Sequence, residues 1–507
     1  MLDTGRRLDW SPAGVDGADP RLEYATLEVP LDHADPGGER ITIALSRLRA
    51  TDPARRRGVL VGVTGGPGGD GGLGRDMPAR LAATRLAEVY DLVGLDPRGT
   101  GASTPLRIEL TPVTSVFDSR PPDAAFAAMA ADMRERELGC ERIGGAMRPH
   151  VNTRNLARDL DALRVALGEE KLSFLGYAYG SYVGAVYGTM FPAHLDRSVL
   201  DSCVHPNWTW REQFLAQGRA VRENVELWAG WTARRAKHFG LGGTADEVVG
   251  AVERVVARLE TGPGVAARTA FDGIVGGLAT DRSAWARLGL LVGELLDATG
   301  GDATGGDPTG GDATGGDATG GDPTGGHAHG GAVDGERVAA LLAEHGTGGW
   351  GARASEQWKQ SVLEAVTLET AWPTDLETYY ADMRAFRAHC PYGHGVLRAA
   401  PWVGAFRTFQ SPEPPTVLAR EGYPAGVIVQ ADGDPMDHRE GGEALAERLG
   451  HHLITVKDSG EHEVYLLAGA NPALEALVEG YLVEGVLPPY RVSVSGSRQA
   501  PPVPEDD

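Results

Sequence analysis

The sequence is poor in cysteine and contains no long hydrophobic run. Only three of its 507 residues are cysteines (Cys140, Cys203 and Cys390), too few for a disulfide-stabilised fold. No stretch of about 18 apolar residues occurs, so no membrane-spanning helix is expected. The first residues, MLDTGRRLDW, lack the apolar segment of a secretion signal. These absences predict a cytoplasmic protein with no membrane partner.

Positive charge is also scarce. The chain has 48 Lys and Arg against 70 Asp and Glu, only four of the 48 are lysines, and the formal net charge is −22. An acidic chain is repelled by phosphate backbones and by anionic lipid surfaces, so nucleic acid is excluded as a partner. Hydrophobic residues make up 42% of the sequence, which is enough for a large buried core.

A low-complexity tract occupies residues 297–331. The unit D-(A/P)-T-G-G occurs six times and is followed by HAHGG, so the tract holds 14 of the 71 glycines. Such a sequence has no apolar surface to bury and predicts a flexible surface insert. Glycine-aspartate repeats that bind calcium carry a large apolar residue in each turn, and this unit has none. We therefore expect no calcium site, and no metal role for His327 and His329.

The rest of the chain divides by its hydrophobic patterns. Residues 22–205 and 406–487 alternate short apolar runs, such as GVLVGV at Gly58–Val63, with helical patterns, which predicts a mostly parallel sheet. Residues 206–405 hold long helical patterns and six tryptophans, and predict a helical cap that carries the tract. The Pro-rich tail, residues 488–507, is expected to be loosely held.

Four motifs follow predicted strands, where open α/β sheets place their functional sites. In chain order they are GGPGG at 65–69, GYAYGS at 176–181, ADGDPMDH at 431–438 and SGEHEVY at 459–465. The second has the glycine spacing of a G-x-S-x-G nucleophile turn, with Ala178 in place of serine. Glycine loop, nucleophile turn, aspartate and histidine is the chain order of hydrolase triads. Singly, Asp432 or Asp434 would form a turn, and His462 would be an ordinary loop histidine.

With LEVPLDHADP (27–36), LDPRGTGAS (95–103) and the stretch 152–192, these motifs resemble the tripeptidyl-aminopeptidase-like α/β-hydrolases, close to the proline iminopeptidases. The resemblance covers most of residues 27–487, with the tract as an unmatched insert. It implies an α/β-hydrolase fold with a helical cap, and serine-type hydrolysis of amide or ester bonds in short peptides or small molecules. No cofactor or metal is implied. The cap stretch 227–242 lacks the cysteines of secreted relatives, in agreement with a cytoplasmic location.

The resemblance also assigns roles to individual residues. Ala178 occupies the nucleophile position, Asp434 matches the triad acid and His462 the triad base. Gly66 and Tyr179 match the backbone N–H donors of the oxyanion hole.

Alanine at the nucleophile position closes the covalent route, because a methyl group cannot attack a carbonyl. Three explanations are open. The chain is a serine hydrolase whose nucleophile has been exchanged for alanine; or alanine is native and the protein is a binding pseudo-hydrolase; or the Asp434–His462 pair acts as a general base without a covalent intermediate. Ser181, three residues further on, is expected to pack or cap the following helix rather than replace the missing hydroxyl.

Overall fold

The computed structural model describes residues 8–12, 19–68, 73–208, 210–300, 333–346 and 357–506. The predicted flexible insert lies outside these ranges from residue 301 onward. Among the described helices, none is both long enough and apolar enough to cross a bilayer.

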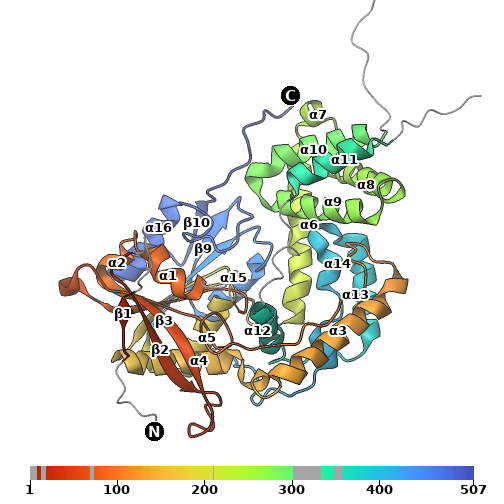
Figure 1. Cartoon of the computed structure of the whole chain (residues 1–507). Helices are drawn as coiled ribbons and strands as arrows, with labels where there is room; N and C mark the ends of the chain where they lie inside the picture. The colour runs from red at the N-terminus through yellow and green to blue at the C-terminus, as the bar shows by residue number, and fades with distance from the viewer. Residues whose placement is uncertain are drawn as a thin grey trace, which may run out of the picture.

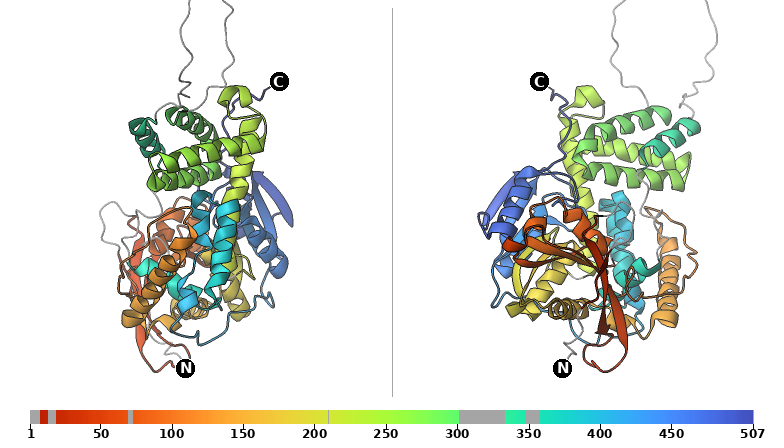
Figure 2. Two further views of the ribbon diagram at one scale, coloured as in Figure 1. Left: turned by 90° about the vertical axis from the view of Figure 1, so that its right-hand side faces the viewer. Right: turned by 60° about the vertical axis from the view of Figure 1, so that its left-hand side comes forward.

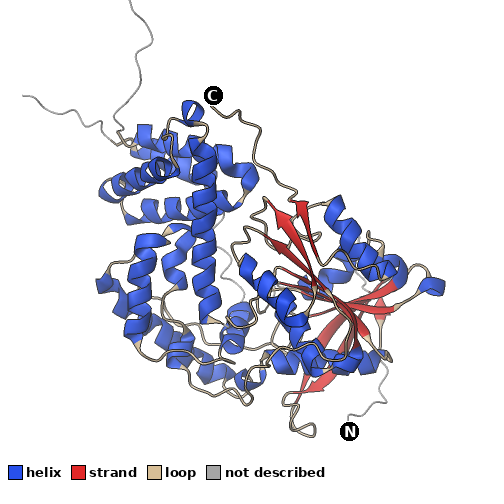
Figure 3. Ribbon diagram, turned by 180° about the vertical axis from the view of Figure 1, so that it is seen from behind, coloured by secondary structure: helices blue, strands red, loops and turns tan. Residues whose placement is uncertain are grey.

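A ten-stranded sheet, counted over the described ranges, forms the centre of the molecule (Figures 1 and 3). Its order is β1-β2-β3-β5-β4-β6-β7-β8-β9-β10. Pairing is antiparallel from β1 to β5 and parallel from β5 to β10, so the predicted mostly parallel sheet is confirmed. The strands are β1 (Ser11–Pro12), β2 (Leu22–Pro30), β3 (Arg40–Leu48), β4 (Gly58–Val63), β5 (Tyr90–Leu95), β6 (Leu172–Tyr177), β7 (Leu195–Asp201), β8 (Val427–Ala431), β9 (His452–Lys457) and β10 (Arg491–Ser495).

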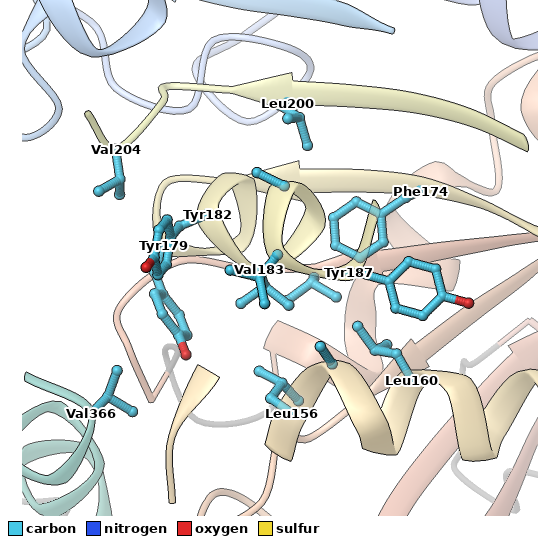
Figure 4. Close-up of a cluster of buried hydrophobic side chains, with 14 of the residues drawn as sticks. Leu156, Leu160, Phe174, Tyr179, Tyr182, Val183, Tyr187, Leu200, Val204 and Val366 are labelled. Atoms are coloured by element: carbon cyan, nitrogen blue, oxygen red, sulfur yellow. The ribbon is translucent and has the colours of Figure 1, made fainter. Parts of the chain in front are cut away.

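Helices cover both faces of this sheet. Alternate residues of β8 face opposite sides, with Ile428 in one hydrophobic cluster and Val427 and Val429 in another. The first cluster includes residues of α4 (Thr153–Leu167), α5 (Tyr179–Met190) and α15 (Arg439–Leu449), and Figure 4 shows its centre between α4 and α5. The second includes residues of α1 (Leu73–Leu81), α2 (Leu86–Val89) and α16 (Pro472–Glu479). Buried on both faces, the central strands are continuous apolar runs.

The chain between β7 and β8 builds the helical cap, which stands beside the sheet (Figures 1 and 2). Its tryptophans are core residues: Trp228 is fully buried, and its Nε1 donates to the Trp285 carbonyl at 3.0 Å. The helices here are α6 (Arg211–Ala233), α7 (Ala236–Phe239), α8 (Ala245–Thr261), α9 (Val265–Thr280), α10 (Trp285–Ala298), α11 (Gly335–His345), α12 (Gln357–Thr367), α13 (Leu376–His389) and α14 (Gly395–Arg398).

Two segments differ from the expectations. Helix α3 (Asp123–Gly144) precedes β6 in the chain but packs against cap helix α13 (Figure 1). The tail, expected to be loosely held, contributes β10 beside β9. Further on, the Val503 carbonyl accepts a hydrogen bond from Nε of cap residue Arg235 at 2.7 Å. Proline content indicated a loose tail, but the alternation in RVSVS at Arg491–Ser495 suits an edge strand.

Candidate active site

The turn between β6 and α5 places Ala178 at the carboxyl edge of the sheet. Ala178 has φ 48° and ψ −118°, a conformation that non-glycine residues rarely adopt. A Cβ on Gly176 would lie 2.3 Å from the Gly180 carbonyl oxygen, and one on Gly180 would lie 2.3 Å from the Val63 carbonyl oxygen. Only glycine fits at these two positions, so the spacing predicted from the sequence is imposed by the sharpness of the turn.

Ser181 does not substitute for the missing hydroxyl. Its Oγ donates to the Ala178 carbonyl at 2.6 Å and accepts from the Val204 N–H at 3.2 Å. The side chain is fully buried within the first turn of α5, as expected.

Asp434 and His462 come together from the loops that follow β8 and β9. Nδ1 of His462 lies 3.0 Å from each carboxylate oxygen of Asp434, which is 1% exposed. The N–H groups of Met436 and Asp437 also donate to Oδ1 of Asp434. Asp432 instead accepts from the N–H groups at 458 and 459, which ties the two loops together. The two candidate aspartates therefore separate into a histidine partner and a loop tie.

His462 carries a strongly perturbed pKa. Burial acts to lower it, but the hydrogen-bonded carboxylate of Asp434 outweighs burial, and the pKa rises to about 10. Asp437 lies further out, with Oδ2 3.9 Å from Nδ1 of His462, and burial raises its pKa well above the usual range. At neutral pH His462 is therefore an imidazolium, with Nδ1 committed to Asp434.

Asp201 holds the histidine loop against the nucleophile turn, a role that the sequence analysis missed. Its buried carboxylate accepts from the N–H groups of Val464 and Tyr465 and from the Ser202 hydroxyl. Its backbone carbonyl accepts from the Ala178 N–H at 2.9 Å. Burial raises the pKa of Asp201 to about 7. An acidic residue ending the buried strand β7 was the available sequence feature.

The proposed oxyanion residues lie on either side of Ala178. Gly66 follows β4, the neighbour of β6, and has φ 124°, while Tyr179 begins α5. A Cβ on the preceding Gly65 would lie 2.6 Å from Cβ of Ala178, so the glycine loop is packed directly against the turn. The first N–H groups of a helix have no partner within it, which suits Tyr179 to an oxyanion. The role of the two N–H groups stays a prediction.

The cap contacts the loops that carry the acid and the histidine. Nδ2 of Asn224 on α6 donates to the Gly433 carbonyl at 2.9 Å, next to Asp434. A Cβ on Gly460 would lie 1.8 Å from the carbonyl oxygen of Thr280, at the end of α9. A hollow of about 370 Å³ opens between α6 and the acid loop, and its lining includes Glu223, Glu226, Asp434 and His438. Within the described ranges, no three His, Cys, Asp or Glu side chains gather as metal ligands.

Comparisons with known proteins agree with this arrangement. Residues 58–238 match a family model described as alpha/beta hydrolase fold, and residues 396–493 match one described as TAP-like protein. Over 46% of this chain and 46% of its own, the serine protease Hip1 of Mycobacterium tuberculosis is 31% identical. Among solved structures, a proline iminopeptidase-related protein from Thermus thermophilus aligns with TM-score 0.34 and 14% identity over 91% of this chain and 98% of its own.

A longer alignment links the chain to a single group of these hydrolases. It is 30% identical to the tripeptidyl aminopeptidase of Streptomyces coelicolor, over 94% of this chain and 84% of that protein. The tripeptidyl aminopeptidase of Streptomyces lividans matches to the same extent. Because the alignment spans both halves of the sheet and the cap between them, the chain belongs to the tripeptidyl-aminopeptidase family of α/β-hydrolases.

Proposed function

We propose that the protein hydrolyses an amide or ester bond, in a short peptide or a small-molecule metabolite, at the site around Ala178. The observation that carries the proposal is the 3.0 Å contact between His462 and Asp434, on the loops packed against the strained turn. Asp434 fixes Nδ1 of the imidazole, so Nε2 is the atom left to exchange a proton with substrate. The N–H groups of Gly66 and Tyr179 would stabilise an oxyanion.

Peptides with a free amino terminus suit the acidic hollow. Glu223 and Glu226 on α6 line it together with Asp434. A protonated amine placed there would be attracted to carboxylates in a partly desolvated setting. The curated relatives named as tripeptidyl aminopeptidases support the same class of substrate. A cytoplasmic location, and the absence of nucleic-acid and membrane partners, remain predictions.

A serine at position 178 would complete an acyl-transfer triad. Its hydroxyl would lose a proton to neutral His462, attack the carbonyl carbon and form an ester, which water would then cleave. The alanine of this chain prevents that ester from forming. The strained turn is kept although alanine gains nothing from it, at a cost of about 1–3 kcal/mol, which favours a site still used for chemistry over a pure binding role.

Ala178→Ser tests the proposal. We expect the variant to cleave tri-alanine p-nitroanilide or p-nitrophenyl acetate about a thousandfold or more above any rate without an acyl-enzyme, and to react with a fluorophosphonate probe. The control is the same variant with His462→Ala, which should lose both properties. If Ala178→Ser neither turns over nor labels, and the unaltered chain is also inert, the protein is not a hydrolase of these bonds.

A further inference from the structure

The space beside the Ala178 methyl group is shared with a carboxylate that the sequence motifs did not assign. A single point, one bond length from Cα of Gly65, lies 2.6 Å from Cβ of Ala178 and 2.9 Å from Oε1 of Glu463. Both groups therefore lie against the same face of Gly65, immediately before the oxyanion residue Gly66. Glu463 is also the residue that follows His462.

The backbone holds Glu463 in this place. Its φ is 58°, in the left-handed region, and its N–H donates to the Ser202 hydroxyl at 2.8 Å. Ser202 in turn donates to the Asp201 carboxylate at 3.0 Å, and the next two N–H groups along the loop also bond to Asp201. A left-handed conformation favours glycine, so glutamate here carries a conformational cost that its side chain must justify.

We propose that Glu463 is the catalytic base of this chain and that water, not residue 178, attacks the substrate. This inference deepens the proposed function and rests on it. The small methyl group of Ala178 leaves room for a water molecule between the Glu463 carboxylate and a carbonyl held by Gly66 and Tyr179. The groups whose titration responds to the charge of Glu463 are Tyr177, Asp201, Asp437 and His462.

The reaction balances without another reagent. The Glu463 carboxylate takes one proton from water as the water oxygen bonds to the carbonyl carbon, and the carbonyl electron pair moves onto its oxygen. The tetrahedral intermediate then collapses, and the C–N or C–O bond breaks with its electron pair on the leaving group. That group takes a proton from Nε2 of His462. The proton on Glu463 returns to His462 through solvent, so each cycle consumes one water.

The protonation of His462 suits this division of labour. A serine-type mechanism needs the neutral imidazole as a base, whereas the carboxylates around His462 favour its protonated form. An imidazolium beside a carboxylate supplies an acid and a base together.

Glu463→Gly tests the proposal in the unaltered Ala178 chain. Glycine suits φ 58°, so the variant should fold at least as well. We expect hydrolysis of tri-alanine p-nitroanilide or p-nitrophenyl acetate to fall about 100-fold or more, and added sodium formate to restore part of it by supplying a small carboxylate. Glu461→Gln is the matched control, because Glu461 lies on the same loop but bonds to the hydroxyls of Ser459 and Ser497.

Three results would overturn the inference. Unchanged or faster turnover in Glu463→Gly would make Glu463 a spectator or an obstruction. A loss that Glu461→Gln shares, or that formate does not rescue, would indicate a structural effect. An inert unaltered chain beside an active Ala178→Ser variant would remove the water mechanism and leave the proposed function intact. Inactivity of both forms would remove the proposed function as well.

Discussion

Single residues in the interior hold charges that the protein keeps at a cost. Glu369 is buried where the cap meets the sheet and accepts from the Thr153 N–H, the Thr153 hydroxyl and Nε1 of Trp210. Thr153 Oγ1 also lies 3.0 Å from the hydroxyl of Tyr179, the residue next to Ala178. Burial raises the pKa of Glu369 from 4.5 to about 7. The stability of the cap contact therefore depends on pH.

The sign of that dependence follows from the two pKa values. Between pH 4.5 and 7 the unfolded chain gives up the proton of Glu369 while the folded chain retains it, so stability falls as pH rises through this window. The loss is at most about 3 kcal/mol. Glu369→Gln has no proton to lose, so its urea-unfolding free energy should fall less between pH 5 and pH 8. Asp201, whose pKa is also about 7, contributes equally to both proteins. Identical pH slopes would contradict this account.

At the scale of elements, the strands were the most predictable part. The apolar run Gly58–Val63 is β4 to the residue, because a strand buried on both faces must be continuously apolar. The glycine spacing located the turn at Ala178, and the pairing of Asp434 with His462 was anticipated from their order along the chain. The roles of Asp201 and Glu463 could not be predicted, because both depend on loops that meet only in three dimensions.

The turn itself supplies a stability prediction. Gly180→Ala would place a methyl group 2.3 Å from the backbone oxygen of Val63, so strand or helix must shift, and we expect a loss of about 1–3 kcal/mol. Gly230→Ala in α6 is the control, since its Cβ would meet only the Arg234 side chain at 3.9 Å. A helix-interior alanine there should raise stability by about 0.5–1 kcal/mol. Thermal unfolding of both variants gives the comparison, and equal melting temperatures would contradict it.

Across the whole molecule, the tail connects the sheet to the cap. After β10 the chain reaches α6 and α7, where the Asp506 N–H donates to the Arg234 carbonyl at 2.8 Å and Val503 packs against the cap core. Proline content gave no indication of this return, because the contacts are made by backbone groups with distant partners.

Removal of residues 497–507 should loosen the cap rather than unfold the sheet. We expect faster amide hydrogen exchange at the end of α6 and in α7, with β8 and β9 unchanged, because the lost contacts all lie on the cap. Glu505→Gln is the control: Glu505 is half exposed in its pairing with Arg234, and such pairs contribute little. Exchange that rises equally in the sheet would show that the tail supports the whole fold.

The insertion of the cap between β7 and β8 has a consequence for how the chain is made. Asp201 ends β7 and Val427 begins β8, so these neighbouring strands leave the ribosome with the whole cap between them. Until then the edge of β7 has no partner, and the loops for His462 and Glu463 do not yet exist. Closing so long a loop is slow, since distant pairing pays its entropy before it gains any contact. The half-made sheet is therefore the stage of synthesis at which an open strand edge is most exposed to other chains.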